Sequence, residues 1–452
     1  MQHYHFIAIG GAAMHNLALA LHDEGYTITG SDDEINDPSK SRLQAKGLLP
    51  ENIGWFPQKI TAQIDGVILG MHARKDNPEL LKAQELGLKI FSYPEFVYEA
   101  TKNKIRIVIG GSHGKTSITS MILHVFAENN IATDFLVGAQ LKGFTNMVKF
   151  SQTSKFAVIE GDEYLTSPLD LRPKFHLYHP NIALISGIAW DHINVFPTWE
   201  NYVEQFKIFI DCIENEGSLV YYKNDTTLNE IASKSLNKNK YAYNVHPYEI
   251  EDNITFLITP LGKLPVKVFG EHNLANISGA KQICMLCGIN EVDFYSAIAT
   301  FEGAAKRLQK IKENNNSVFY FDFAHSPSKL KATTKAVKEQ FKERKLIACM
   351  ELHTFSSLKK EFLEQYHGAM DEADIPYVYF NPHTIEHKKL EAINPQEVKD
   401  SFKNEKVKVF TNSKEMVESL KKLKGKDTVF LMMTSGNFDG IKMEELADLL
   451  LD

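Results

Sequence analysis

One stretch of this chain constrains its fold more than any other: residues 105–126, which read IRIVIGGSHGKTSITSMILHVF. The β-branched run predicts a strand, the glycines a tight loop, and the apolar spacing after Lys115 a helix. That order is typical of a P-loop, in which backbone N–H groups and a helix N-terminus bind phosphates. An ordinary glycine turn is the alternative, since the position five before Gly114 is Ile109 where the usual motif has glycine.

The residue types in and near this loop suit polyphosphate chemistry. Lys115 supplies a mobile positive charge, and the Thr116 hydroxyl supplies a ligand for Mg²⁺. Glu160 ends the apolar run FAVIE, where its carboxylate oxygens can supply a second ligand for Mg²⁺. The alternative is that Glu160 is a surface acid at the end of a strand. The candidate phosphate-binding residues are Gly111, Ser112, His113, Gly114, Lys115, Thr116 and Ser117.

The length of 452 residues is too great for one hydrophobic core and predicts about three domains. The net charge is -7 and no long basic run is present, which argues against nucleic acid or an anionic membrane as the main partner. No apolar run reaches the ~20 residues that span a bilayer, so we expect a cytoplasmic protein. The four cysteines form no disulfide framework, and we expect Cys284 and Cys287 to pack in a core.

Short apolar strands alternate with helical patterns along the chain. This rhythm predicts an α/β fold with mostly parallel sheets covered on both faces, and sites at the carboxyl ends of the strands. The first block, which begins HYHFIAIGGAAMHNLALALHDEGYTITGSDDE, predicts a strand, a Gly-Gly turn, a helix and a second strand. This unit is typical of a Rossmann-like nucleotide site in which Asp32 meets a ribose, although a plain tight turn has the same pattern. A polar stretch at residues 306–316, KRLQKIKENNN, begins the last block.

Two further segments can complete a phosphate site. Asp191 and His192 follow a buried-strand pattern, so His192 is either a metal ligand or a loop cap. The segment FGEHNLANISGAK places Asn273 and Asn276 at the start of a helix, where amide side chains read an adenine edge or cap the helix.

Taken in order, the segments GSHGKTS, EGDEY, WDHIN, GEHNLAN, FEGAAKR and DFAHSP resemble the Mur ligase family of ATP-dependent, amide-forming enzymes. The resemblance covers nearly the whole chain and implies a need for ATP and Mg²⁺. It also implies three domains: a Rossmann-like UDP-binding domain at residues 1–102, a P-loop ATPase domain at 103–303, and a Rossmann-like domain for the amine substrate at 304–452.

The resemblance implies substrates as well. The roughly 100 residues before the P-loop favour the UDP-N-acetylmuramate branch of the family over the folylpolyglutamate synthetases. Within it, EGDEYLTSPLDLRPKFHLYHP is especially similar to the recycling ligases that join UDP-N-acetylmuramate to L-alanyl-γ-D-glutamyl-meso-diaminopimelate. The biosynthetic ligases that add L-alanine are close relatives and the alternative. In this family the muramate carboxylate takes the γ-phosphate of ATP to give an acyl phosphate, which the amine displaces.

Residue roles follow by the same resemblance. Lys115 steadies the moving phosphoryl group, Thr116 and Glu160 hold one Mg²⁺, and His192 helps to hold a second. Lys207 matches a lysine that is carbamylated in several members, with a solvated helix lysine as the alternative. The remaining candidates are Asn273, Asn276, Arg307 and Asp322 for ATP; Gly11, Ala13, Met14, Asp32 and His72 for the UDP-sugar; and His325 and His353 for the acceptor.

The segment CMELHTFSSLKK bears on the choice of acceptor. In the L-alanine ligases that this segment resembles, the pattern is His, then Arg, and a second Arg three positions further on. The guanidinium groups of the two arginines suit the carboxylate of a small zwitterion. Here His353 is present, but Thr354 and Ser357 occupy the arginine positions. We therefore expect the tripeptide to be preferred over L-alanine.

Two other classes stay open at this point. A P-loop kinase or NTPase would explain residues 105–126 but not the first block. A non-catalytic, nucleotide-gated binding protein would have little need of the metal-binding set. Phosphate release that requires both a UDP-sugar and an amine distinguishes a ligase from either one.

Overall fold

The computed structural model describes residues 2–138, 144–190 and 195–452. Within these ranges the chain forms two compact units: the first comprises residues up to 190, 195–244 and 279–294, and the second comprises residues 245–278 and 295–452. No helix in this described part combines the length and the apolar character that crossing a membrane requires.

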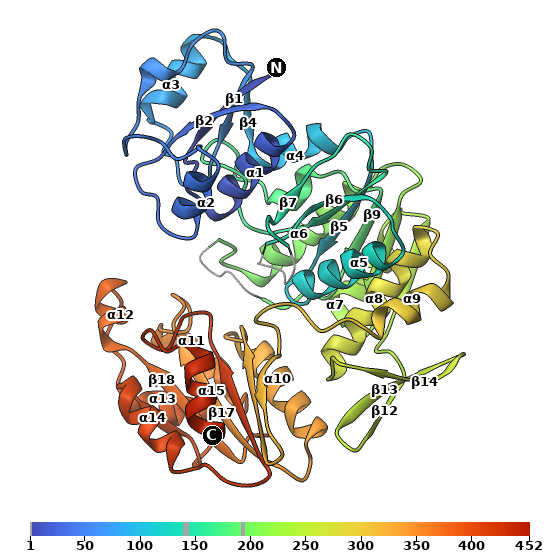
Figure 1. Cartoon of the computed structure of the whole chain (residues 1–452), viewed down its shortest axis with the longest axis vertical. Coiled ribbons are helices and arrows are strands. Elements are labelled where there is room, and N and C mark those ends of the chain that lie inside the picture. The colour runs from blue at the N-terminus through green and yellow to red at the C-terminus, as the bar shows by residue number, and fades with distance from the viewer. Residues whose placement is uncertain (1, 139–143, 191–194) are drawn as a thin grey trace. The chain divides into compact units, whose positions relative to one another are not determined.

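A four-stranded parallel sheet forms the N-terminal part of the first unit (Figure 1). Its strand order is β2-β1-β3-β4. Its strands are β1 (His3–Ile7), β2 (Thr27–Ser31), β3 (Gly66–Leu69) and β4 (Ile90–Ser92). The accompanying helices are α1 (Ala12–Asp23), α2 (Ser39–Ala45), the short η1 (Pro57–Lys59), α3 (Pro78–Glu85) and α4 (Tyr93–Thr101). Ser92 and Glu95 form a capping box that starts α4 directly after β4.

A seven-stranded sheet forms the rest of the first unit, in the order β11-β10-β9-β5-β8-β6-β7. Only β7 pairs antiparallel among its described strands, which are β5 (Ile105–Gly110), β6 (Thr133–Leu136), β7 (Val148–Lys149), β8 (Phe156–Glu160), β9 (Ile182–Ile185), β10 (Ser218–Tyr222) and β11 (Asn239–Tyr243). The helices that lie wholly within this segment are α5 (Lys115–Glu128), η2 (Lys174–Leu177), α6 (Trp199–Asp211) and α7 (Thr226–Lys234). Helices α8 (Glu271–Leu286) and α9 (Glu291–Ile298) each have residues in both units.

The second unit contains two sheets. A small antiparallel one has β12 (Tyr248–Glu251), β13 (Ile254–Thr259) and β14 (Gly262–Val266). A six-stranded one has the order β15-β16-β20-β17-β18-β19, with β15 (Gln309–Glu313) antiparallel and the others parallel: β16 (Ser317–Asp322), β17 (Lys345–Leu352), β18 (Ile375–Phe380), β19 (Lys408–Phe410) and β20 (Thr428–Met433). Its helices are α10 (Pro327–Gln340), α11 (Lys360–Leu363), η3 (Glu364–Tyr366), α12 (Pro382–His387), α13 (Pro395–Phe402), α14 (Ser413–Lys421) and α15 (Met443–Leu451).

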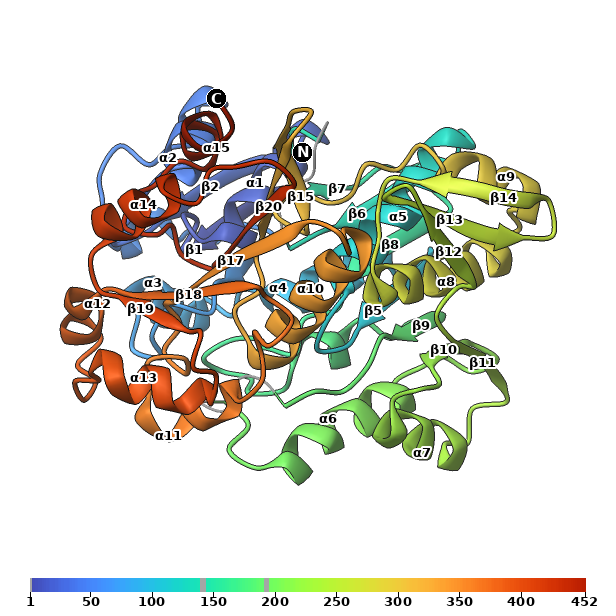
Figure 2. The same ribbon diagram turned by 90° about the horizontal axis from the view of Figure 1, so that it is seen from below.

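Helices cover both faces of the six-stranded sheet. Figure 2 shows α11 and α13 on one side of β18, and α14 and α15 on the other side of the sheet. Alternate residues of β20 pack into the two resulting cores: Val429, Leu431 and Met433 into one, and Phe430 and Met432 into the other. Successive side chains of a strand point to opposite faces, so a strand covered on both sides reads as a continuous apolar run.

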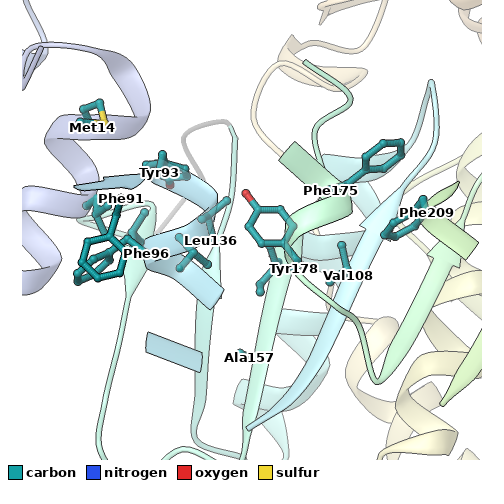
Figure 3. Close-up of a cluster of buried hydrophobic side chains, with 14 of the residues drawn as sticks. Met14, Phe91, Tyr93, Phe96, Val108, Leu136, Ala157, Phe175, Tyr178 and Phe209 are labelled. Atoms are coloured by element: carbon teal, nitrogen blue, oxygen red, sulfur yellow. The ribbon is translucent and has the colours of Figure 1, made fainter. Parts of the chain in front are cut away.

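One buried cluster continues from the N-terminal sheet into the central sheet of the first unit (Figure 3). Tyr93 at the start of α4 and Tyr178 after η2 both belong to it. Phe175 of η2 stacks on Phe209 of α6, with ring centroids 4.5 Å apart. The predicted α/β class with parallel-rich sheets is confirmed, and the antiparallel β7, β15 and β12–β14 are the departures from it.

Candidate active site

The phosphate-binding loop lies between the end of β5 at Gly110 and the start of α5 at Lys115. Gly111 and Gly114 have φ angles of 124° and 80°, in the region that glycine adopts without strain. A Cβ on Gly111 would lie 2.2 Å from the Oγ of Ser186, which follows β9. The loop therefore lies directly against the residues that follow β9, and only glycine fits at this position.

Lys115, the first residue of α5, is held by two oxygen atoms. Its Nζ donates to the carbonyl oxygen of Gly111 at 2.7 Å and to Glu163 Oε2 at 2.7 Å. Burial disfavours the ammonium form, but Glu163 and the nearby acids outweigh burial and raise the pKa of Lys115. Lys115 is thus charged at neutral pH, and an incoming phosphate would compete with Glu163 for it.

Thr116 and Glu160 place two hard oxygen atoms side by side. The Thr116 hydroxyl donates to Glu160 Oε1 at 2.9 Å, and the N–H of Gly138 donates to Glu160 Oε2 at 3.0 Å. Parallel pairing of β5 with β8 sets Glu160 opposite Ile109, at the carboxyl edge beside the loop. This confirms the predicted position of Glu160 at the end of a strand.

This oxygen pair fits Mg²⁺, which is usually bound through one or two protein oxygens, with substrate phosphates and water completing the shell. Across the described ranges no group of three or more His, Cys, Asp or Glu side chains is arranged for a metal ion. A site of that kind is what Zn²⁺ would need. The donor set is therefore that of a phosphate-bound Mg²⁺ rather than of a metal held by protein alone.

A buried network behind the loop involves residues that the sequence did not single out. The Tyr202 hydroxyl on α6 lies 2.8 Å from the Ser112 Oγ and donates to Glu163 Oε1 at 3.4 Å. Ser112 Oγ also accepts from the N–H of Ala189 at 2.8 Å. Two features of the sequence could have indicated this network. The hydroxyl of a buried tyrosine usually finds a polar partner, and Glu163 lies within the segment EGDEY. Of the other loop candidates, Ser117 is buried, and His113 Nδ1 lies 2.7 Å from the carbonyl oxygen of Ser112.

Two predicted residues of the metal site stand apart from this arrangement. His192 lies outside the described residues. Lys207 is on the exposed side of α6, where its Nζ lies 2.8 Å from Glu204 Oε2, one helical turn away. The role of Lys207 in catalysis stays a prediction.

The adenine candidates lie in the first turns of α8. Asn273 is buried, and its side-chain amide donates to the carbonyl oxygen of Phe269 at 3.0 Å, so it ties the helix to the chain before it. Asn276 is also buried, one turn later. Burial lowers the pKa of the adjacent His272 to about 4, so that imidazole is neutral at physiological pH.

Asp322 and Arg307 come together at the end of β16. Asp322 is buried and accepts from the N–H groups of Leu308 at 2.7 Å and Ala324 at 2.6 Å. Burial raises the pKa of Asp322 to about 6, against the opposing charge of Arg307. The guanidinium of Arg307 lies 4.9 Å from the ring centroid of Phe323. Asp322 therefore joins two backbone segments in addition to any contact with ATP.

The acceptor candidates follow β16 and β17, which flank β20 at the same sheet edge. His325 Nδ1 lies 2.9 Å from the carbonyl oxygen of Phe323. His353 is partly exposed, and its Nδ1 is 3.7 Å from the buried carboxylate of Glu351. Thr354 and Ser357, which replace the two arginines, hydrogen-bond to each other at 2.9 Å.

The UDP-sugar candidates Gly11, Ala13 and Met14 lie at the N-terminal end of α1. Asp32, just after β2, accepts from the N–H of Gly10 at 2.7 Å, so its carboxylate fixes the turn that leads into α1. His72 is exposed after β3. Asp32 therefore contacts the turn between β1 and α1, whereas His72 lies in the connection between β3 and α3.

A P-loop lysine beside a threonine–glutamate oxygen pair, at the carboxyl edge of a parallel sheet, defines the class of nucleotide-dependent phosphoryl-transfer proteins. Three family models match successive parts of the chain: the catalytic domain of the Mur ligase family at residues 3–105, the Mur ligase middle domain at 109–284, and the glutamate ligase domain of Mur ligases at 306–436. The chain belongs to the Mur ligase family.

Similar proteins are found among both sequences and structures. The UDP-N-acetylmuramate–L-alanine ligase of Lactobacillus delbrueckii subsp. bulgaricus is 30% identical over 374 residues, covering 80% of each chain. The UDP-N-acetylmuramate-alanine ligase of Thermotoga maritima matches with a TM-score of 0.72 and 18% identity, covering 97% of each chain. The UDP-N-acetylmuramate:L-alanyl-gamma-D-glutamyl-meso-diaminopimelate ligase of Neisseria meningitides matches with a TM-score of 0.60 and 25% identity, covering 67% of this chain and 98% of that chain.

Members of this family are ATP-dependent ligases that form amide bonds, and they generally use Mg²⁺. This chain is accordingly an ATP-dependent ligase of peptidoglycan synthesis. The predicted three-domain Mur ligase architecture is confirmed, and both the simple P-loop NTPase and the non-catalytic binding protein are set aside.

Proposed function

We propose that the chain joins the lactyl carboxylate of UDP-N-acetylmuramate to the amine of L-alanyl-γ-D-glutamyl-meso-diaminopimelate. In the first step a carboxylate oxygen bonds to the γ-phosphorus of ATP as the bond to ADP breaks, giving an acyl phosphate. In the second step the amine nitrogen bonds to the carbonyl carbon, phosphate leaves, and the nitrogen loses a proton. The observation that carries the phosphoryl transfer is the Thr116–Glu160 oxygen pair beside Lys115.

Each group in the site has a part in this scheme. Lys115 neutralises charge on the moving phosphoryl group, which is the main requirement of phosphoryl transfer. Thr116 and Glu160 would hold Mg²⁺, which supplies charge neutralisation at the phosphates. We assign a second metal contact to His192, adenine contacts to Asn273 and Asn276, and further ATP contacts to Arg307 and Asp322.

The domain bounds and remaining sites are part of the same proposal. Residues 1–102 would bind the UDP-sugar, 103–303 ATP, and 304–452 the amine substrate. Gly11, Ala13 and Met14 suit the diphosphate because a helix N-terminus favours anions. Asp32, His72, His325 and His353 keep the roles that the resemblance implies.

The tripeptide is supported by the loop after β17. Thr354 and Ser357 are uncharged, so neither offers the guanidinium group that would bind the carboxylate of a small zwitterion. They also hydrogen-bond to each other, and Ser357 is buried. A tripeptide can gain binding energy along its length. We expect it to exceed L-alanine in kcat/KM by at least a factor of about ten, which corresponds to ~1.4 kcal/mol.

L-alanine is the second candidate, and the sequence relatives favour it. The curated relatives similar to this chain at 30% identity are named as UDP-N-acetylmuramate–L-alanine ligases. A tripeptide ligase is among the structural neighbours, at 25% identity. Both acceptors present the same L-alanyl amine, so the chemistry is common and only the size of the acceptor site differs.

Phosphate release from ATP tests the proposal directly. It would be measured with UDP-N-acetylmuramate, alone and with L-alanine or the tripeptide, and the amide product confirmed by mass spectrometry. Release that requires the UDP-sugar and is faster with the tripeptide supports the proposal. Equal or better use of free L-alanine makes this the biosynthetic ligase, and no dependence on either acceptor overturns the reaction.

A further inference from the structure

Helices α1 and α2, which accompany the N-terminal sheet, are hydrogen-bonded to the segment 144–147. This segment leads into β7 of the central sheet. Arg42 on α2 donates through Nη1 to Asn16 Oδ1 at 2.9 Å and through Nη2 to the carbonyl oxygen of Thr145 at 2.6 Å. Asn146 Nδ2 donates to the carbonyl oxygen of Asn16 at 3.0 Å, and the N–H of Met147 donates to Asn16 Oδ1 at 3.3 Å.

From Met147 the hydrogen bonds continue to the proposed metal pair. The N–H of Val137 donates to the carbonyl oxygen of Met147 at 2.9 Å. The next N–H along the chain, that of Gly138, holds Glu160 Oε2 at 3.0 Å, and the other oxygen of Glu160 accepts from Thr116. A Cβ on Gly138 would lie 3.0 Å from Glu160 Oε1, so this backbone directly abuts the carboxylate.

The other end of the series lies in the first turn of α1, where the UDP-sugar diphosphate is proposed to bind. His15 is buried, which lowers its pKa, so the imidazole is neutral. Its Nδ1 lies 2.9 Å from the carbonyl oxygen of Gly11, and its Nε2 lies 3.0 Å from Arg42 Nη1. Asn16 Nδ2 donates to the carbonyl oxygen of Ala12 at 2.7 Å. Arg42 and Asn16 therefore contact both the turn and the segment 144–147.

The partners of Arg42 give it little role as an ion-pair residue. Within the described ranges its hydrogen bonds go to neutral groups, and no carboxylate lies within ion-pair distance. A rigid guanidinium fork that reaches two acceptors at once fixes geometry, whereas a surface ion pair adds little.

We propose that Arg42 and Asn16 are positioning residues for Glu160. By fixing the segment 144–147 against α1, they hold the backbone of Val137 and Gly138 in the place that orients the Glu160 carboxylate toward Mg²⁺. The inference rests on the proposed metal role of Glu160 and on the proposed UDP-sugar site at the first turn of α1. Since the same two side chains bind the first turn of α1, filling the UDP-sugar site strengthens metal binding, and the coupling is reciprocal.

Metal binding without turnover tests this proposal. Mn²⁺, which takes the same oxygen ligands as Mg²⁺, would be titrated into the full chain with ADP and followed by electron paramagnetic resonance. Asn16→Ala, and Arg42→Lys, which keeps the charge but loses the fork, are expected to weaken Mn²⁺ binding about tenfold, at the lower end for outer-shell partners of a metal. Affinity for ADP without metal should be unchanged, a separation that general loosening of the fold would not produce.

The controls separate the failure of this inference from failure of the proposed function. Lys46→Met removes a cation just after α2 whose partner, Asp23, lies in the same N-terminal sheet region, and it should bind Mn²⁺ like the wild type. Glu160→Gln should lose Mn²⁺ binding; if it does not, the metal assignment of Glu160 is wrong. If Glu160→Gln loses the metal but Arg42→Lys and Asn16→Ala bind it normally, with or without UDP-N-acetylmuramate, the positioning role is overturned.

Discussion

The Nζ of Lys115 lies 2.7 Å from the Oε2 of Glu163, a carboxylate that solvent does not reach. Glu163 therefore holds the positive charge of Lys115 at the place where a phosphate is proposed to bind. Binding of ATP would therefore exchange one anionic partner of Lys115 for another. Little desolvation accompanies such an exchange, because the cation is already largely shielded from solvent.

Replacement of Lys115 by alanine should abolish amide formation, because the charge on the moving phosphoryl group is left unneutralised. We expect kcat to fall by at least about 100-fold, as for removal of a single charge-stabilising donor. Circular dichroism should show a folded protein. Lys281→Ala, which removes another partly buried lysine paired with Glu291, is the matched control and should retain activity. Near-normal turnover of Lys115→Ala would refute the phosphate-site assignment.

Gly111→Ala should destabilise the first unit and prevent ATP binding. The new Cβ would meet Ser186 at 2.2 Å while the backbone keeps a φ of 124°. Backbone strain alone costs about 1–3 kcal/mol, and the steric clash adds to it. Gly262→Ala carries a similar φ of 106° with no atom within 4 Å of its Cβ, so it isolates the strain. Calorimetric melting midpoints that fall equally in the two variants would contradict the clash.

Asp322 should make stability depend on pH. Its pKa of about 6 in the folded protein lies above the ordinary 3.8, so the folded state binds an extra proton between these values. Stability from this group therefore rises as the pH falls through 6, by about 1 kcal/mol between pH 7.5 and 5. Wild type should gain melting temperature over this interval relative to Asp322→Asn, measured by calorimetry. A difference between the two proteins that does not change with pH would exclude the shift.

Lys207 gives a sharp test of the carbamate interpretation. Lys207 is exposed and forms an ion pair with Glu204, which favours the interpretation as a solvated helix lysine. Such an exposed pair contributes only about 0–1 kcal/mol to stability. We expect Lys207→Ala to keep kcat within about twofold, since a change of that size is below 1 kcal/mol. Bicarbonate should leave the wild-type rate unchanged. Loss of activity in Lys207→Ala, restored by short carboxylic acids, would instead establish a carbamylated lysine.

Local patterns predicted the elements that contain the loop. The run before Gly111 forms β5, the helix begins at Lys115, and Glu160 ends β8 beside them. These features depend on neighbours in sequence, so periodicity and glycine chemistry are enough to predict them. The polar stretch at residues 306–316 concealed β15, an edge strand whose exposed residues mask the strand pattern.

Long-range partners could not be predicted in the same way. Tyr202 showed only the apolar periodicity of α6, which places its ring in the core but says nothing of where the hydroxyl points. The contact of Asp32 with a ribose stays a prediction, whereas the hydrogen bond from the N–H of Gly10 to its carboxylate was not foreseen. Arg42 and Thr145 are 103 positions apart, and only the packing of two sheets brings them together.

The burial of β20 on both faces changes what specifies its alignment. A strand with one wet face resists slipping by one residue because polar groups would enter the core. Between Val429 and Met433, β20 has no such polarity, and a slip there would only exchange Leu431 with a neighbour such as Phe430 or Met432. Side-chain shape must therefore select the register. Volume-changing substitutions in this strand should be felt at its end, where the N–H of Thr434 bonds the carbonyl oxygen of Asp322.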